Sequence, residues 1–184
     1  MDLALWALGK VMIYEDIRSS IRNGDILGYH GAAVFSKLIE LFTGKKDPQA
    51  WSHIAVFYWD GDGLWLAQEY EGVGFGCYPA SQLIAKFIKE RGQCFLGRAP
   101  EIVENAPDGI RQVLSTYRTT PKLRPYGYGS LARILFDDRE DPDKVQAVCS
   151  IFAQQAWEAC GYKFTRLFAP EDFKTVVTEE VVIS

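Results

Sequence analysis

A histidine, an acidic residue and a late cysteine together have the chemistry of an acyl-transfer site. His53 stands at the start of a near-continuous apolar run, and Glu69 lies on the next such run. Cys149 opens a further apolar stretch near the end of the chain. A thiol becomes a nucleophile when an imidazole takes its proton and a third polar group orients that imidazole. These residue types could together form a Cys–His–acid set for nucleophilic catalysis. The alternative is that His53 is a core histidine on a strand with its hydrogen bonds satisfied.

The hairpin that would carry His53 and Glu69 leaves two registers open. The turn sequence D-G-D-G separates the two apolar runs. A loop with an odd number of residues centred on Gly61 places His53 opposite Glu69, which would then orient the imidazole. A two-residue turn instead places His53 opposite Tyr70 and moves Gln68 to the face of the histidine. Glu69 is the first expectation, and Gln68 is the alternative.

The stretch that carries Cys149 has helical spacing of its apolar residues. A reactive thiol is favoured at a helix N-terminus, whose partial positive charge stabilises a thiolate. Asp141-Pro142-Asp143 is also a helix start, and it would leave Cys149 about two turns inside the helix. We expect the helix to break before Val148 or to begin anew there. The alternative is a buried, inert cysteine.

Strands in the middle of the chain and helices around them must position these groups. The sequence predicts strands at 26–29, 52–59, 64–70, 72–78, 93–99 and 176–183. It predicts helices at 3–21, 36–42, 79–91, 107–118, 128–136 and within 142–160. Clustered strands with flanking helices predict an α+β fold with a central antiparallel sheet. Residues 1–184 are expected to form a single domain, with 1–22 as an N-terminal packing helix.

Composition and charge limit the kinds of partner that this protein is expected to bind. The net charge of -4 and the pI near 5.3 argue against nucleic-acid binding. The four cysteines form no C-x-x-C pair and only two histidines are present, so we expect free thiols, no metal and no cofactor. No apolar run reaches the ~18 residues that span a bilayer. The N-terminus lacks the marks of a signal peptide, which predicts a cytoplasmic protein, and its apolar residues leave peripheral membrane contact open.

The order of short motifs along the chain extends this interpretation. In sequence come G-D-I at 24–26, Ser36, S-H-I-A-V at 52–56, Glu69, Gly72-Val73, P-A-S-Q-L at 79–83, Arg98, Tyr126, C-S at 149–150, Pro170 and Asp172. This series resembles the NlpC-type, circularly permuted papain-like hydrolases, in particular the YiiX-like group, over about residues 24–172.

The resemblance implies a permuted papain-like fold in which histidine precedes cysteine in the chain. It also implies Cys149 as nucleophile, His53 as base and Glu69 as the orienting residue. Asp25 and Tyr126 are further candidates, for lining the substrate cleft or donating to an oxyanion. The alternatives are that Asp25 is a turn acid capping its own backbone and that Tyr126 is a packing aromatic.

The resemblance indicates the substrate less directly than it indicates the catalytic residues. Relatives of such a fold include peptidases, amidases and lipid acyltransferases, so the first expectation is hydrolysis of a peptide or isopeptide amide, cell-wall peptides included, through a thioester. A lipid-directed acyltransferase or thioesterase is the second. A binding module that keeps the fold without turnover is the third.

Overall fold

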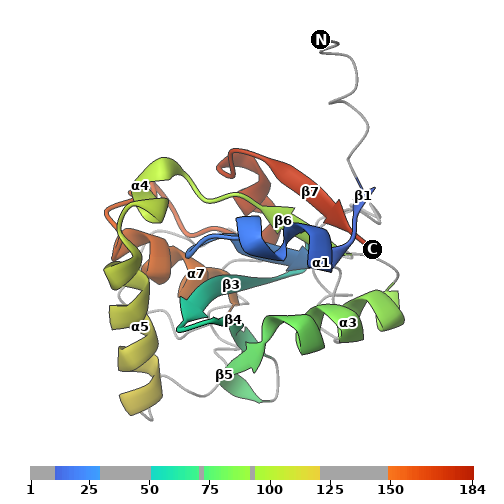
Figure 1. Ribbon diagram of the computed structural model, residues 1–184. Helices are drawn as coiled ribbons and strands as arrows, with labels where there is room; N and C mark the ends of the chain where they lie inside the picture. Colours follow the sequence, from blue (N-terminus) through green and yellow to red (C-terminus); the bar gives the residue numbers. More distant parts are fainter. Residues whose placement is uncertain (1–10, 30–50, 71–72, 92–93, 121–148) are drawn as a thin grey trace.

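A sheet of seven strands forms the centre of the described chain (Figure 1). The computed structural model describes residues 11–29, 51–70, 73–91, 94–120 and 149–184. The strands in spatial order are β1 (Val11–Met12), β7 (Glu180–Ile183), β6 (Cys94–Gly97), β2 (Ile26–Tyr29), β3 (His53–Asp60), β4 (Gly63–Tyr70) and β5 (Gly74–Pro79). β1 runs parallel to β7, and the other neighbouring strands pair antiparallel.

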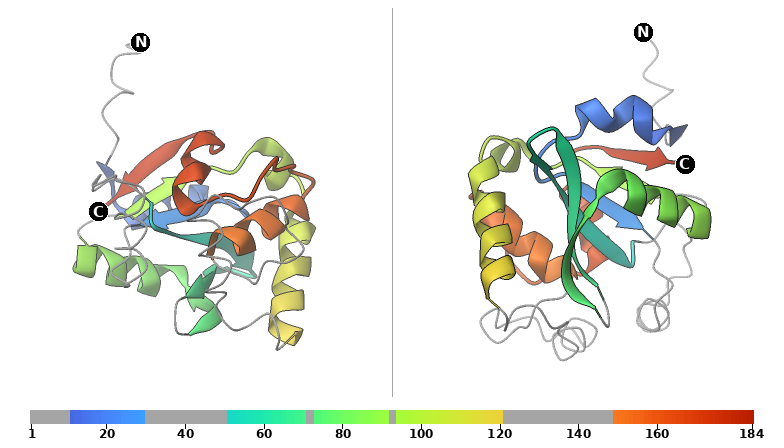
Figure 2. Two further views of the ribbon diagram at one scale, coloured as in Figure 1. Left: turned by 180° about the vertical axis from the view of Figure 1, so that it is seen from behind. Right: turned by 60° about the horizontal axis from the view of Figure 1, so that its bottom comes forward.

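Helices cover both faces of this sheet, as Figure 2 shows. α1 (Tyr14–Ile17) and α3 (Ala80–Arg91) lie on one face, and α5 (Pro107–Thr119) and α7 (Cys149–Glu158) lie on the other. Short helical segments complete the described part: η2 (Arg18–Ser20), α4 (Glu101–Glu104) and η5 (Pro170–Thr175). This arrangement confirms the expected α+β fold with a mainly antiparallel sheet flanked by helices.

Strand β3 is buried on both sides, which explains its near-continuous apolar sequence. Ile54 and Val56 belong to the core cluster under α5 and α7. Ala55 and Phe57 belong to the second cluster, under α1 and α3. Burying each large apolar side chain of this kind contributes about 1.5–3 kcal/mol, so both helix layers hold the strand in place.

The β3–β4 hairpin closes with a two-residue turn. Asp60 pairs with Gly63, and Gly61 adopts a φ of 57°, the left-handed conformation that such tight turns require. The expectation of an odd-numbered loop is therefore wrong, and the two-residue alternative is correct. Because side chains alternate along a strand, this single-residue difference changes which groups share a face with His53.

The hairpin opens towards the end that carries His53. β3 and β4 pair only as far as Val56 and Ala67. Beyond that point β3 pairs with β2, as far as His53, and β4 pairs with β5, as far as Tyr70. The two strands of the hairpin thus part, and the N–H and C=O groups on their inner edges need other partners.

Several predicted elements match the structure, and one needs correction. The helices expected at 79–91 and 107–118 are α3 and α5, with nearly the predicted bounds. The expected N-terminal packing helix is confirmed over α1 and η2 but is wrong at Val11–Met12, which is a strand. Its pairing with β7 overrides the local helical spacing. Residues 1–10 and the helices expected at 36–42 and 128–136 lie outside the described residues.

Candidate active site

His53 is fixed by a hydrogen bond to a glutamine on the facing strand. Its Nε2 lies 3.0 Å from Oε1 of Gln68, which also accepts a hydrogen bond from the Tyr29 hydroxyl. An amide oxygen only accepts hydrogen bonds, so the imidazole proton must sit on Nε2. Nδ1 is then the basic nitrogen, and no described residue makes a hydrogen bond to it. This is the tautomer that a general base acting through Nδ1 requires.

Glu69 does not orient His53, which corrects the first expectation. The two-residue turn puts Gln68 on the histidine's face of β4 and turns Glu69 to the opposite face. Gln68, the alternative drawn from the same hairpin, is the partner that the structure shows.

The Cys149 thiol lies among backbone N–H groups. Those of Ile54, Ser150 and Cys149 are within hydrogen-bonding reach of its sulfur. The backbone N–H groups of successive residues in a strand point alternately to its two neighbouring strands. Because the Phe57 N–H donates to the Asp25 carbonyl on the β2 side, the Ile54 N–H, three residues earlier, points towards β4. The hairpin is open at this level, so the sulfur takes a position where β4 would otherwise supply an acceptor. The thiol thus sits at the peptide bond that joins His53 to Ile54.

Burial keeps both the Cys149 thiol and the His53 imidazole neutral. It raises the pKa of the Cys149 thiol to about 11, although the surrounding N–H groups act in the opposite direction. It lowers the pKa of the His53 imidazole to about 4, although the bond to Gln68 favours the charged form. At neutral pH the site therefore holds a thiol and a free imidazole base rather than a thiolate–imidazolium pair.

The thiol and the imidazole approach the same peptide bond from different sides of the sheet. The His53 ring lies against Tyr29, whose ring stacks on Phe87 of α3. Cys149 belongs to the core cluster on the α7 side. No hydrogen bond joins its sulfur to either ring nitrogen in the described residues. The structure thus brings the thiol to the backbone beside His53, while the two side chains lie on opposite faces of the sheet.

Glu69 shares the face of the thiol. Its side chain is fully buried, and its two carboxyl oxygens have no hydrogen-bond partner among the described residues. Burial raises its pKa to about 8, so the carboxyl is protonated at neutral pH. Its charge, when present, acts on both Cys149 and Tyr117 and raises their pKa values.

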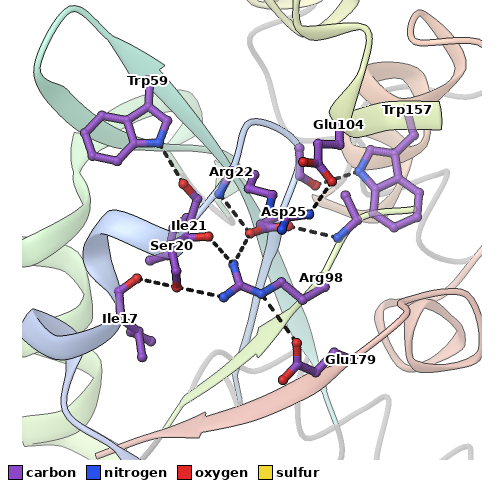
Figure 3. A network of polar contacts seen from close by, with 12 residues as sticks. Ile17, Ser20, Ile21, Arg22, Asp25, Trp59, Arg98, Glu104, Trp157 and Glu179 are labelled. Carbon is purple, nitrogen blue, oxygen red and sulfur yellow. Dashed lines mark hydrogen bonds and ion pairs between the residues drawn. The ribbon is translucent and has the colours of Figure 1, made fainter. Parts of the chain in front are cut away.

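Asp25 has a structural role, which corrects its prediction as a cleft residue (Figure 3). Its carboxylate accepts hydrogen bonds from Arg98 Nη1 at 2.7 Å and from the backbone N–H groups of Ala99 and Arg22, each at 2.9 Å. Asp25 directly precedes the first residue of β2, whereas Tyr29, which pairs with His53, is the last residue of that strand. Its oxygens tie β2, β6 and the preceding turn together and are not available to a substrate.

Two predictions concern residues outside the described part of the chain. Tyr126 is one, and the helix break expected before Val148 is the other. Sequence reasoning missed the Ile54 N–H as a partner of the thiol. No residue type signals it, because it depends on where the pairing of two strands stops.

Comparisons with known proteins give a match in structure but none in sequence. No protein-family model matches the chain, and no curated protein matches it in sequence. Among solved structures, the metalloprotein yiiX from Escherichia coli O157:H7 is similar, with 15% identity and a TM-score of 0.49. The match covers 89% of this chain and 96% of that chain.

Two searches of the described residues found nothing. These residues contain no group of three or more His, Cys, Asp or Glu side chains that could hold a metal ion. Within the same ranges, no helix combines the length and the apolar character needed to cross a membrane.

Proposed function

We propose that this chain is a cysteine hydrolase that cleaves an amide bond, in a peptide or an isopeptide, through a thioester on Cys149. The observation that carries the proposal is the setting of that thiol. Its sulfur lies on backbone N–H groups at the peptide bond beside His53, whose basic Nδ1 is made available by Gln68. A nucleophile, a base in the right tautomer and an orienting residue are thereby assigned to named side chains.

The reaction would begin from the neutral pair. Nδ1 of His53 takes the thiol proton as the sulfur attacks the amide carbon, and a carbon–sulfur bond forms. Backbone N–H groups around the sulfur, that of Cys149 first, stabilise the oxyanion. The protonated imidazole then gives its proton to the leaving nitrogen as the carbon–nitrogen bond breaks. Water, deprotonated by the same imidazole, hydrolyses the thioester and restores the thiol.

The test is whether an acyl group becomes attached to this cysteine. We expect p-nitrophenyl acetate, a small activated ester, to release a burst of nitrophenol as it acetylates the protein. Mass spectrometry of the acid-quenched protein should place the acetyl group on Cys149, and Cys149→Ala should abolish both signals. Cys160, another buried free thiol at the end of the same helix, provides the matched control, and Cys160→Ala should keep the burst.

Three results would decide against the proposal. An equal burst in Cys149→Ala would place the reaction elsewhere. Acetylation spread over all four cysteines would reflect ordinary thiol chemistry rather than a built site. Absence of any adduct on Cys149 would favour a binding module that keeps the fold without turnover.

A further inference from the structure

Buried polar atoms without partners belong to residues that are close in sequence to the proposed catalytic residues. In the described chain four such side-chain atoms occur: Nε1 of Trp51, both carboxyl oxygens of Glu69 and Oγ of Ser150. Ser150 follows the nucleophile, Glu69 follows the residue that orients the base, and Trp51 lies two positions before the base. Buried polar groups are almost always paired, because an unpaired one loses its hydrogen bonds to water without replacement. The two unpaired oxygens of Glu69, on the face of the sheet that carries the Cys149 thiol, therefore point to a missing polar partner at this site.

Glu69 carries the largest part of this unmet hydrogen bonding. It extends from β4 to the face on which Cys149 lies, and its charge would be felt at that thiol. Phe75 stands directly opposite it on β5, and Phe75 packs against Tyr117 and Phe152. The phenyl rings of Phe75 and Phe152 offer the carboxyl no hydrogen bond, and the Tyr117 hydroxyl donates its proton to Gln155. A buried carboxyl group without hydrogen bonds lowers the stability of the fold unless a bound ligand supplies the missing hydrogen bonds.

We propose that Glu69 is a specificity residue that binds the amide group of the substrate as a neutral carboxylic acid. The inference rests on the proposed function and defines its substrate class more narrowly. It assigns a role to the two unpaired oxygens and to the position of this side chain on the thiol's face of the sheet.

A neutral carboxyl and an amide are complementary. The carboxyl O–H donates to the amide oxygen, and the carboxyl C=O accepts from the amide N–H. An ester keeps the oxygen but has no N–H, so one buried carboxyl oxygen would stay unpaired when an ester binds. Burial raises the pKa of Glu69 to about 8, which keeps the donor proton in place at neutral pH. The titratable groups on which the charge of this carboxyl would act are Cys149 and Tyr117, and burial keeps both of them neutral at that pH.

The experiment compares two alkylating agents that differ only in this group. Both reagents alkylate the Cys149 sulfur: iodoacetamide attaches a CH2CONH2 group and methyl iodoacetate a CH2COOCH3 group. In each case a sulfur–carbon bond forms, the carbon–iodine bond breaks with loss of iodide, and the thiol proton goes to His53 or water. Site-resolved mass spectrometry at neutral pH gives the two rates, and the same ratio for glutathione removes the difference in intrinsic reactivity. We expect the normalised amide-to-ester ratio to be about fivefold above that of glutathione, the effect of roughly one neutral hydrogen bond.

Two variants test the assignment. Glu69→Gln keeps one donor and one acceptor and should keep the raised ratio. Glu69→Met has similar volume but no hydrogen-bonding group that matches an amide, and its ratio should fall to that of glutathione. Glu101→Gln, on an exposed residue of α4, is the matched control and should change nothing. Cooperative thermal unfolding of each variant shows that the fold is retained.

Either of two results would overturn the inference. A wild-type ratio equal to that of glutathione would mean that the site does not recognise amides. A raised ratio that survives in Glu69→Met would mean that another group recognises them. Failure of the proposed function is a different outcome, since Cys149 would then show the amide preference towards alkylation but no acetyl adduct from p-nitrophenyl acetate.

Discussion

Around the thiol, desolvation decides which residues carry charge. Burial holds the pKa of His53 at about 4, that of Glu69 at about 8 and that of Cys149 at about 11. All three are therefore neutral over a broad range around neutrality. A thiol in this state needs a base during attack rather than beforehand, which makes the orientation of the imidazole decisive.

Gln68 should matter through that orientation. Gln68→Ala leaves Nε2 of His53 and the Tyr29 hydroxyl without their shared acceptor, so both the tautomer and the ring position lose their support. We expect acetylation of Cys149 to slow about tenfold or more, and stability to fall by about 1–3 kcal/mol. The acetylation burst and urea unfolding measure the two effects.

Gln154 in α7 serves as the control for that experiment. It is also buried and makes two hydrogen bonds, to Arg166 O and Phe168 N. Gln154→Ala should lose similar stability but acetylate Cys149 at nearly the wild-type rate. Equal slowing in both variants would mean that Gln68 acts only as a structural residue.

Glu69 predicts a pH dependence of stability with a definite sign. Its pKa is near 4.5 when unfolded and about 8 when folded, so between these values the folded state binds more protons. The stability that this group contributes is fully present below pH 4.5 and is lost as pH rises to the folded pKa of about 8, by on the order of 5 kcal/mol. His53 acts in the opposite direction between pH 4 and 6.5, where the unfolded state binds more protons.

Glu69→Gln separates the two contributions. Urea unfolding should show that the variant no longer loses stability as pH rises towards 8. It should still lose stability as pH falls from 6.5 towards 4, because His53 is unchanged. A wild-type protein whose stability does not fall as pH rises through about 8 would contradict the burial of an uncompensated carboxyl at this position.

At the scale of the elements, the β3–β4 hairpin shows what sequence could and could not predict. The apolar runs and the glycine-rich turn located both strands, and the periodicity of α3 and α5 located those helices. The register depended on one residue in the turn, which local sequence left open and which decided between Gln68 and Glu69. The N-terminal strand β1 could not be predicted, because its pairing with β7 involves residues at the other end of the chain.

Asp25 makes a prediction at this scale, because it joins elements rather than serving the site. Its side chain is 1% exposed and pairs with Arg98, which also donates to the Ser20 carbonyl. Asp25→Ala leaves the guanidinium and two backbone N–H groups without their acceptor, and removing one partner of a buried pair costs about 3–5 kcal/mol. Urea unfolding should show this loss.

The double variant Asp25→Ala/Arg98→Ala should be less destabilised than the sum of the single variants, because each single variant already breaks the pair. Protein that remains folded should still acetylate Cys149. A folded, stable Asp25→Ala protein that no longer acetylates would instead return Asp25 to the site.

At the scale of the whole molecule, the site depends on a sheet covered on both faces. His53 is held by the layer that contains α3, and Cys149 is delivered by the layer that contains α7. Trp51 anchors the start of β3 from the α7 side, where its ring lies over Gly28 so closely that a Cβ there would be 2.2 Å away. Sequence placed His53 in a strand and Cys149 in a helix correctly. It could not show that the two side chains lie on opposite faces of the sheet, since that follows from strand register and from packing across the molecule.

The most direct test of the account is whether His53 assists the thiol. His53→Gln removes the base but keeps a polar group at the position, and the rate of Cys149 acetylation by p-nitrophenyl acetate measures the effect. Near neutral pH we predict a loss of about 100-fold or more, the usual contribution of a positioned base. The loss should shrink as pH approaches the thiol pKa of about 11, because a thiolate needs no base. Equal rates in wild type and His53→Gln near neutral pH would contradict the account, since the thiol would then react without this imidazole.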